Sequence, residues 1–238
     1  MIKYLYRKLI KPNAPYFLRE MITDFSFNRH YIKSYSEFGE DLIIKNYFKV
    51  FKSDEKKYLD IGCYHPKMIS NTHWLFKWGW DGVVVDTSNR KLKLFEKRRN
   101  GKVKTLNKAV VSNYEKKSDI KFYFFNQPFS GIDTSSKELA LKMKTKDNNF
   151  VEETIENIKI NDLLSLDNFD FVNIDIEGMD EEVVSSIDFN NIYKPKLICF
   201  EKHNVFKDLD SKSIIKLKEN GYKHLFTTGP SIAFYLDN

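Results

Sequence analysis

Four short apolar segments, separated by longer stretches with helical spacing, constrain the fold of this 238-residue chain most strongly. They are KYLDIG at 57–62, GVVVD at 82–86, FDFVNID at 169–175 and KLICFE at 196–201. Segments that are apolar on both faces predict strands that are buried on both faces. Their alternation with helical stretches is typical of a mostly parallel sheet with helices on both sides. We therefore predict an α/β fold.

Both ends of the chain carry sequence outside this alternation. Residues 1–35 mix apolar with basic residues and are interrupted by Pro12 and Pro15, which predicts a partly helical N-terminal extension. The last two apolar segments, KHLFTTG and IAFYLDN, predict a terminal hairpin that adds an antiparallel edge strand to the sheet. The predicted organisation is an extension at 1–35 followed by one large domain at 36–238.

The charge of the chain is mildly positive, with 39 Lys and Arg against 33 Asp and Glu and a formal net charge of +6. Such an excess favours an anionic partner, for example a phosphorylated substrate, a nucleic acid or an acidic membrane face. A composition biased by AT-rich coding explains the same excess without any such partner. Because no clustered Arg patch is interleaved with aromatic residues, no nucleic-acid partner is expected. Peripheral membrane association through the N-terminal segment stays open as an alternative to a packed extension.

The cysteine content bears on the cellular compartment. The chain has two cysteines, Cys63 and Cys199, and each lies in an apolar, strand-like run. Buried thiols of this kind are expected in a reducing compartment, where disulfides are rare. No apolar stretch approaches the roughly 20 residues needed to span a bilayer, and the N-terminus lacks the pattern of a signal peptide. A cytoplasmic location is therefore expected.

Polar residues at the ends of the first two predicted strands form the first candidate binding site. Asp60 and Gly62 end the first strand, and Asp86 ends the second. Ligands of open parallel sheets bind beyond the carboxyl ends of the strands, and an acid roughly 25 residues after the first strand meets ribose hydroxyls in nucleotide-binding units. The pattern suggests an adenosine-containing ligand, with ordinary helix-entry acids as the alternative. Because one glycine does not make GxGxxG, NAD and FAD fit less well than a ligand without a diphosphate.

Two later strands also end in charged residues. One ends with Asp175 and Glu177, and the next ends with Glu201 and His203. Carboxylates with no cationic partner nearby in the sequence are costly unless they bind something, so Asp175 or Glu177 is expected to be functional. Asp175, Glu201 and His203 could together hold a divalent cation. The histidine spacing shows no metal motif, however, and no metal is predicted.

Taken together, these motifs resemble the FkbM family of S-adenosylmethionine-dependent methyltransferases. The resemblance covers about residues 36–203, and the order of its segments is more specific than any one of them. Two positions depart from the family pattern: Glu37 stands where Gln is common, and Thr87 and Ser88 follow Asp86 where Pro is frequent. The segments that carry the resemblance are 36–41, 58–66, 70–72, 79–82, 85–86, 106–110, 173–180 and 195–201.

The resemblance implies a class I methyltransferase fold, which is Rossmann-like with a mostly parallel seven-stranded sheet, and S-adenosylmethionine as the cofactor. The residues implied to bind this cofactor lie at or just after the ends of predicted strands. They are Asp60, Gly62 and Tyr64 at its amino-acid part, Asp86 at its ribose, Asn107 and Ala109 near its adenine, and Asp175 beside its methyl group.

Members of the family commonly methylate hydroxyl groups on sugars or natural products, and many accompany polysaccharide synthesis. The resemblance therefore implies an O-methyltransferase that acts on a small-molecule or glycan acceptor, such as a sugar or surface-glycan precursor. The acceptor hydroxyl needs a general base within hydrogen-bond reach, and the candidates are Asp175, His65 and His203. A nucleic-acid methyltransferase and a catalytically inactive cofactor-binding or scaffold module of the same fold remain as alternatives.

Overall fold

The computed structural model describes residues 32–126, 130–131, 133–145, 149–176, 178–202 and 210–237. The chain divides into two compact units, Met1–Ser34 and Tyr35–Asn238. The helices and strands named below all belong to the second unit. Within the described ranges, no helix is both long enough and apolar enough to cross a lipid bilayer.

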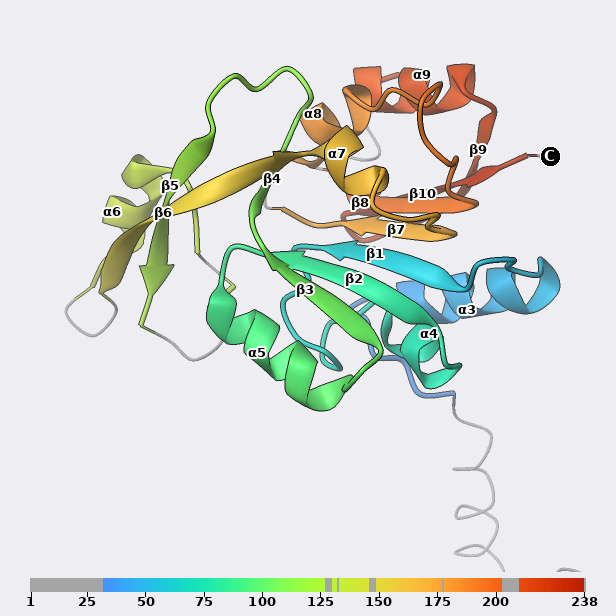
Figure 1. Ribbon diagram of the computed structural model, residues 1–238, viewed down its shortest axis with the longest axis horizontal. Coiled ribbons are helices and arrows are strands. Elements are labelled where there is room, and N and C mark those ends of the chain that lie inside the picture. Colours follow the sequence, from blue (N-terminus) through green and yellow to red (C-terminus); the bar gives the residue numbers. More distant parts are fainter. Residues whose placement is uncertain are drawn as a thin grey trace, which may run out of the picture. The chain divides into compact units, whose positions relative to one another are not determined.

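In the described part of the second unit, seven strands form one sheet in the order β3-β2-β1-β7-β8-β10-β9 (Figure 1). Neighbouring strands pair in parallel except at β10, which is antiparallel to both of its neighbours. This is the mostly parallel sheet expected of a class I methyltransferase, so the predicted fold class is confirmed. The strands are β1 (Lys57–Ile61), β2 (Asp81–Asp86), β3 (Val103–Asn107), β7 (Phe171–Ile174), β8 (Leu197–Glu201), β9 (Tyr222–Thr228) and β10 (Ser231–Leu236).

The antiparallel strand lies one position inside the edge at which the sequence analysis placed it. The predicted terminal hairpin forms, but β10 lies between β8 and β9, and the edge strand β9 runs parallel to β8. The side chains of β10 explain this position, because Ile232, Ala233 and Phe234 are all at most 1% exposed. A segment that is apolar on both faces is more stable inside a sheet than at its edge.

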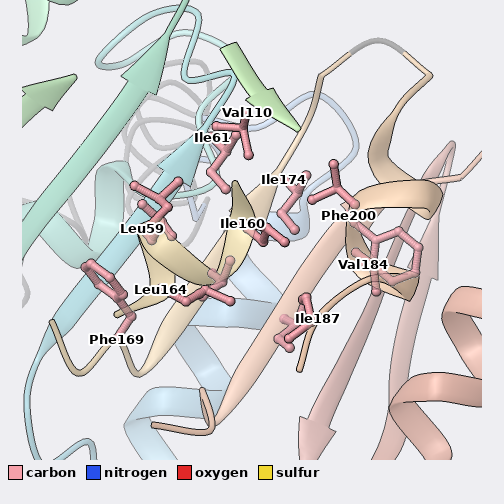
Figure 2. Close-up of a cluster of buried hydrophobic side chains, with 14 of the residues drawn as sticks. Leu59, Ile61, Val110, Ile160, Leu164, Phe169, Ile174, Val184, Ile187 and Phe200 are labelled. Atoms are coloured by element: carbon pink, nitrogen blue, oxygen red, sulfur yellow. The ribbon is translucent and has the colours of Figure 1, made fainter. Parts of the chain in front are cut away.

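Helices cover both faces of the sheet (Figure 1). On one face, α3, α4 and α5 supply Ile44, Leu75 and Phe95 to a buried cluster. On the other face, α7, α8 and α9 supply the apolar side chains of a second cluster, part of which Figure 2 shows. The helices are α3 (Glu40–Val50), α4 (His73–Lys77), α5 (Asn89–Arg98), α7 (Ile160–Leu164), α8 (Asp180–Ser185) and α9 (Lys212–Glu219).

Strand β1 contributes to both cores because its side chains alternate between the two faces of the sheet. Leu59 and Ile61 point into the cluster shown in Figure 2. Tyr58 belongs to the cluster beneath α3, α4 and α5. Asp60 is two residues from Tyr58 and therefore shares its face, which places a carboxylate at the carboxyl end of the strand on the α5 side.

A second, smaller sheet has the order β4-β6-β5, with β4 (Ala109–Val111), β5 (Asp119–Phe125) and β6 (Phe150–Lys159). The chain leaves the main sheet at Lys108, between β3 and β4, so two strands that are adjacent in the sequence belong to different sheets. Helix α6 (Lys137–Met143) packs on one face of the small sheet through the buried Ala140. In Figure 1 the small sheet lies beyond the carboxyl ends of β1 and β2, where it can wall a binding site.

Candidate functional site

A cavity of about 340 Å³ lies at the carboxyl ends of the parallel strands. Its walls come from the ends of β1, β2, β7 and β8, the loop after β1, the small sheet and the turn before β10. The edge of the sheet is therefore hollowed where the sequence analysis expected a ligand. Six of the predicted site residues line it: Asp60, Gly62, Tyr64, Asp86, Ala109 and Asp175.

Gly62 brings the loop after β1 against the end of β7. Its φ of +73° lies in the left-handed region, and a Cβ at this position would lie 1.6 Å from the carbonyl oxygen of Asp175. The Asp175 N–H donates to the carbonyl of Ile61 (3.0 Å), so the two strand ends are tied together at this point. Only glycine fits here, and its small size opens the backbone to the cavity.

The carboxylate of Asp60 is 3% exposed. Its Oδ2 accepts a hydrogen bond from the Thr72 hydroxyl (2.6 Å), and its Oδ1 accepts one from the Asn173 amide (3.0 Å). Burial raises the pKa of Asp60, and the positive charge of Arg99 acts in the opposite direction. Asp60 is therefore fixed in one orientation at the rim of the cavity.

Asp86, at the end of β2, is 7% exposed. Its Oδ1 accepts a hydrogen bond from the backbone N–H of Ser88 (2.7 Å), and the backbone of Tyr64 also hydrogen bonds to the carboxylate. Burial raises the pKa of Asp86, whereas the nearby Lys91 ammonium lowers it. The loop after β1 is thus joined to the acid that the sequence analysis assigned to ribose hydroxyls.

Asn107 and Ala109 occupy different positions relative to the cavity. The Asn107 side-chain amide donates to the backbone carbonyls of Asp86 (3.1 Å) and Thr87 (2.7 Å), and Asn107 is not among the lining residues. It holds the end of β2 in place. Ala109 is buried and lines the cavity directly.

The side of the cavity next to β7 and β8 is rich in carboxylates. Asp175 follows β7, is exposed and lines the cavity, as do Glu201 at the end of β8 and Glu37 before α3. Glu40 is 2% exposed, and its two oxygens accept hydrogen bonds from the Phe38 N–H (2.9 Å) and the Thr228 hydroxyl (2.8 Å). Glu40 therefore holds the wall of the cavity together, whereas Asp175 is exposed in that wall.

Of the two predicted catalytic histidines, His65 is among the described residues, and it does not line the cavity with Asp175. The Nδ1 of His65 accepts hydrogen bonds from the backbone N–H groups of Lys67 (3.0 Å) and Met68 (2.9 Å), and His65 is not among the cavity-lining residues. Burial and the neighbouring Arg98 and Arg99 lower its pKa. His203 lies outside the described residues, so its role as a base stays a prediction.

The metal site considered for Asp175, Glu201 and His203 includes a residue outside the described ranges. Within those ranges, no group of three His, Cys, Asp or Glu side chains is placed to hold a metal ion.

Several wall residues had no recognisable signal in the sequence. Phe122 lines the cavity, but nothing near it in the chain marks it as part of a site. Phe38 also lines the cavity; it lies in the family segment 36–41, but the resemblance assigned it no role. Arg99 is fully buried below the cavity, although it lies in the basic run KRRN, which reads as a solvated helix end. Asp133 pairs with Lys91 (3.5 Å) and so ties the loop before α6 to α5. Such contacts join residues that are far apart in the sequence, and periodicity does not reveal them.

The chain is similar to a known protein family over most of its length and, more distantly, to two solved structures. The family model "Methyltransferase FkbM domain" matches residues 60–224. No curated protein matches the chain. An O-methyltransferase from Bacillus cereus, solved in complex with SAH, shares 14% identity, with 98% of this chain and 96% of that chain covered and a TM-score of 0.41. The plantazolicin methyltransferase BpumL, solved with a monoazolic desmethylPZN analog and SAH, shares 12% identity, with 83% and 61% covered and a TM-score of 0.33.

Proposed function

The chain belongs to the FkbM family of S-adenosylmethionine-dependent methyltransferases, and we propose that it methylates a hydroxyl group of a sugar or surface-glycan precursor. We assign the reaction to a methyltransferase domain at 36–238, with 1–35 as an N-terminal extension, in the cytoplasm. The observation that carries this proposal is the cavity in which the buried acids Asp60 and Asp86 stand at the ends of neighbouring strands and which the exposed Asp175 also lines.

The half of the cavity at β1, β2 and β4 suits the cofactor. Asp86 offers a carboxylate to a ribose diol, and Ala109 leaves room for a flat base against the small sheet. Gly62 and Tyr64 border the space for the amino-acid part. The cofactor supplies a sulfonium-activated methyl group, so the protein has to position the acceptor and receive its proton.

The half of the cavity at β7 and β8 suits a hydroxyl-bearing ring. Phe38 is 52% exposed, and its ring lies so close to Gly229 that a Cβ there would be 2.6 Å away. This contact holds a flat aromatic surface at the cavity. Glu37 and Glu201 stand in the same wall, and ionised carboxylates accept hydrogen bonds from hydroxyl groups. An aromatic surface beside such acceptors supports a neutral polyhydroxyl acceptor.

The charges in the cavity favour this acceptor over a nucleic acid. Among the described lining residues, the basic ones are Lys91 and Lys108, and both lie on the cofactor side. Each is already paired, Lys91 with Asp133 (3.5 Å) and Lys108 with Glu156 (2.5 Å). Phosphate groups near Asp175 would meet the negative charges of Glu37 and Glu201 in the same wall, which is unfavourable.

Asp175 is our candidate for the general base. It is exposed at the end of β7, and the backbone beside it is fixed by the close approach of Gly62. A carboxylate in hydrogen-bond reach of the acceptor hydroxyl takes its proton as the methyl group is transferred, which typically contributes about 10²- to 10⁴-fold to the rate. His65 contributes to the same site by shaping the turn that carries Tyr64.

Calorimetry with S-adenosylhomocysteine tests the proposed cofactor site. The wild-type chain should bind it, and Asp86→Ala should weaken binding by about tenfold or more because hydrogen bonds to a charged group are lost. No binding by a folded wild-type sample would remove the proposal.

The proposed acceptor is tested by a methyl-transfer assay with labelled S-adenosylmethionine and cell extracts. Asp175→Asn should retain S-adenosylhomocysteine affinity and lose about 10²- to 10⁴-fold in methyl transfer. Methylated sugars or glycans identified by mass spectrometry would support the proposal. Methylated RNA or DNA would instead favour the nucleic-acid alternative, and binding without transfer to any acceptor would favour an inactive module.

A further inference from the structure

We propose that Arg99 is a positioning residue of the cofactor site, which holds the loop after β1 and keeps Asp60 charged and correctly oriented through the hydroxyl of Thr72. The proposal rests on the function proposed above, because it concerns how the Asp60 end of the same cavity is organised. Arg99 follows α5 and does not line the cavity itself, so it would act only through its neighbours.

The guanidinium of Arg99 is fully buried and donates four hydrogen bonds. Its Nη1 donates to the Tyr58 hydroxyl (2.8 Å) and to Thr72 Oγ1 (2.9 Å). Its Nη2 donates to the Pro66 carbonyl (2.8 Å) and to Ser70 Oγ (3.1 Å). Three of these four acceptors belong to the loop between β1 and α4. A buried cation is costly, and its contacts concentrate on the loop that borders the cavity.

Thr72 links this cation to Asp60. The Thr72 hydroxyl accepts a hydrogen bond from Arg99 and donates one to Asp60 Oδ2 (2.6 Å). Because Arg99 has only donors, the hydroxyl hydrogen of Thr72 is directed at the carboxylate. The other oxygen of Asp60 is held by Asn173 (3.0 Å), whose own amide oxygen accepts a hydrogen bond from Asn71 (2.9 Å). The network thus fixes both oxygens of Asp60.

The same contacts hold a strained loop. Tyr64 and Ile69 have φ values of 44° and 49°, in the left-handed region that non-glycine residues rarely adopt. Both line the cavity. Arg99 binds the loop between them, at Pro66, and just after them, at Ser70. Strained backbone of this kind persists only where surrounding contacts over-determine it, and Arg99 supplies such contacts.

The charges around Asp60 make Arg99 its main counter-charge. The titratable groups that face Asp60 are Tyr58 on β1, Cys63 after β1, Asp86 on β2 and Cys199 on β8. Burial raises the pKa of Tyr58 to about 12 and those of both thiols above their usual range, so all three groups are neutral near pH 7. Asp86 adds a second negative charge. Among the described residues, no carboxylate forms a direct ion pair with Arg99, and the Thr72 hydroxyl is the hydrogen-bonded link between its guanidinium and Asp60.

The test is a carbon-detected NMR titration of the Asp60 carboxyl group in the ligand-free chain. Arg99→Met and Thr72→Val should each raise the pKa of Asp60 by about one unit or more, since each removes stabilisation of the carboxylate. Tyr58→Phe is the matched control: it also removes one hydrogen bond to Arg99, but it leaves the link to Asp60 intact, so the titration should not move. Arg99→Lys keeps the charge and should restore part of the wild-type titration.

Calorimetry with S-adenosylhomocysteine across pH provides the second readout. As the pH is lowered, the affinity for S-adenosylhomocysteine should fall at a higher pH in Arg99→Met and Thr72→Val than in the wild type. This pH shift should equal the shift of the Asp60 titration, and Tyr58→Phe should keep the wild-type profile. If wild-type chain does not bind S-adenosylhomocysteine, the proposed function fails, while the NMR titration still decides the role of Arg99.

Two results would overturn the proposal. One is an unchanged Asp60 titration in Thr72→Val, which preserves the shape of the side chain and carries the test even where Arg99→Met does not fold. The other is an equal shift in Tyr58→Phe, which would show that Arg99 acts only by packing.

Discussion

The absence of a side chain at Gly62 shapes the geometry of the whole site. The backbone of Asp175 occupies the space that any side chain at position 62 would need, with 1.6 Å between a Cβ and its carbonyl oxygen. The candidate base therefore stands next to the cofactor loop only because position 62 has no side chain. This close approach gives the Asp60-Ile61-Gly62 motif a second role besides access of the backbone to a ligand.

Gly62→Ala should destabilise the fold and abolish S-adenosylhomocysteine binding. Left-handed backbone alone costs an alanine about 1–2 kcal/mol, and the clash with Asp175 adds about 1–3 kcal/mol. Gly101→Ala is the matched control, because Gly101 has a similar φ of +68° but nothing within 4 Å of its Cβ position. Urea unfolding should show a clearly larger loss for Gly62→Ala. Equal losses in the two variants would contradict the close approach.

His73 predicts a pH dependence of stability. Its Nδ1 donates to the Pro66 carbonyl (2.9 Å), and its ring contacts Tyr35 edge-on. Burial, together with the positive charges of Arg99 and Lys77, lowers the pKa of His73 from 6.5 to about 4, and the hydrogen bond to the Pro66 carbonyl acts in the opposite direction. The unfolded chain takes up the proton at higher pH than the folded chain does. The stabilisation from neutral His73 is therefore complete above pH 6.5 and is lost as the pH falls toward 4.

His73→Phe should lose less of its unfolding free energy than the wild type between pH 7.5 and about 5, because phenylalanine has no proton to take up. Urea unfolding at both pH values measures the difference. An NMR titration of the His73 ring near its ordinary pKa of 6.5 would contradict this assignment.

The sequence could reveal the part of the site that follows from local pattern. Asp60, Asp86 and Asp175 were predicted because each is a charge at the end of an apolar strand, and all three line the cavity. Arg99 could not be distinguished from the exposed cations beside it, because its acceptors lie 27–41 residues earlier in the chain. His65 was a plausible base by position, but hydrogen bonds within its own turn occupy its Nδ1.

At the scale of elements, it was easier to predict which segments form strands than which strands pair with each other. The six apolar segments that were predicted to be strands form β1, β2, β7, β8, β9 and β10. The break at Lys108 was not predicted, because β3 and β4 are adjacent in the sequence and differ only in the strands they pair with. The position of β10 depends in the same way on where α9 places β9. Which strands pair is set by packing between residues far apart in the sequence, and the β-strand propensity of a segment gives no information about that packing.

Lys202 joins three elements behind the candidate site. It follows β8 and is 2% exposed, and its Nζ contacts both carboxylate oxygens of Glu181 on α8 (2.8 and 2.9 Å). The Ser213 hydroxyl on α9 donates to the same carboxylate (3.1 Å). The contacts therefore fasten the end of β8, and Glu201 beside it, to two helices.

Glu181→Ala should destabilise the fold by about 2–3 kcal/mol, because it removes the carboxylate from a buried ammonium group. The loss should stay below the ~3–5 kcal/mol of a fully buried pair, since 35% of the Glu181 side chain is exposed. The double variant Glu181→Ala with Lys202→Met should be more stable than Glu181→Ala alone when both are compared by urea unfolding. Additive losses would show that the pair does not interact.

At the scale of the whole molecule, the cavity is lined by segments from many parts of the second unit. The segment before α3, both sheets and the turn before β10 all contribute to its wall, and the described lining residues fall between Glu37 and Ser231. Binding of a ligand that spans this cavity should therefore stabilise the entire unit. At a concentration about 100 times its dissociation constant, the gain is about 2.7 kcal/mol.

A chain that begins at Tyr35 should fold and bind S-adenosylhomocysteine as the full-length chain does, because no described lining residue precedes Glu37. Calorimetry and thermal unfolding of the two chains measure this. A chain that begins at Lys52 is the contrasting control: it lacks Ile44 and Phe48, which are buried in the core, and the cavity residues 37–40, so it should not fold.

Sedimentation with anionic vesicles adds a separate readout for the N-terminal extension. If removal of residues 1–34 abolishes vesicle binding and leaves the affinity for S-adenosylhomocysteine unchanged, membrane association belongs to that extension. If removal abolishes both, the extension is part of the folded enzyme.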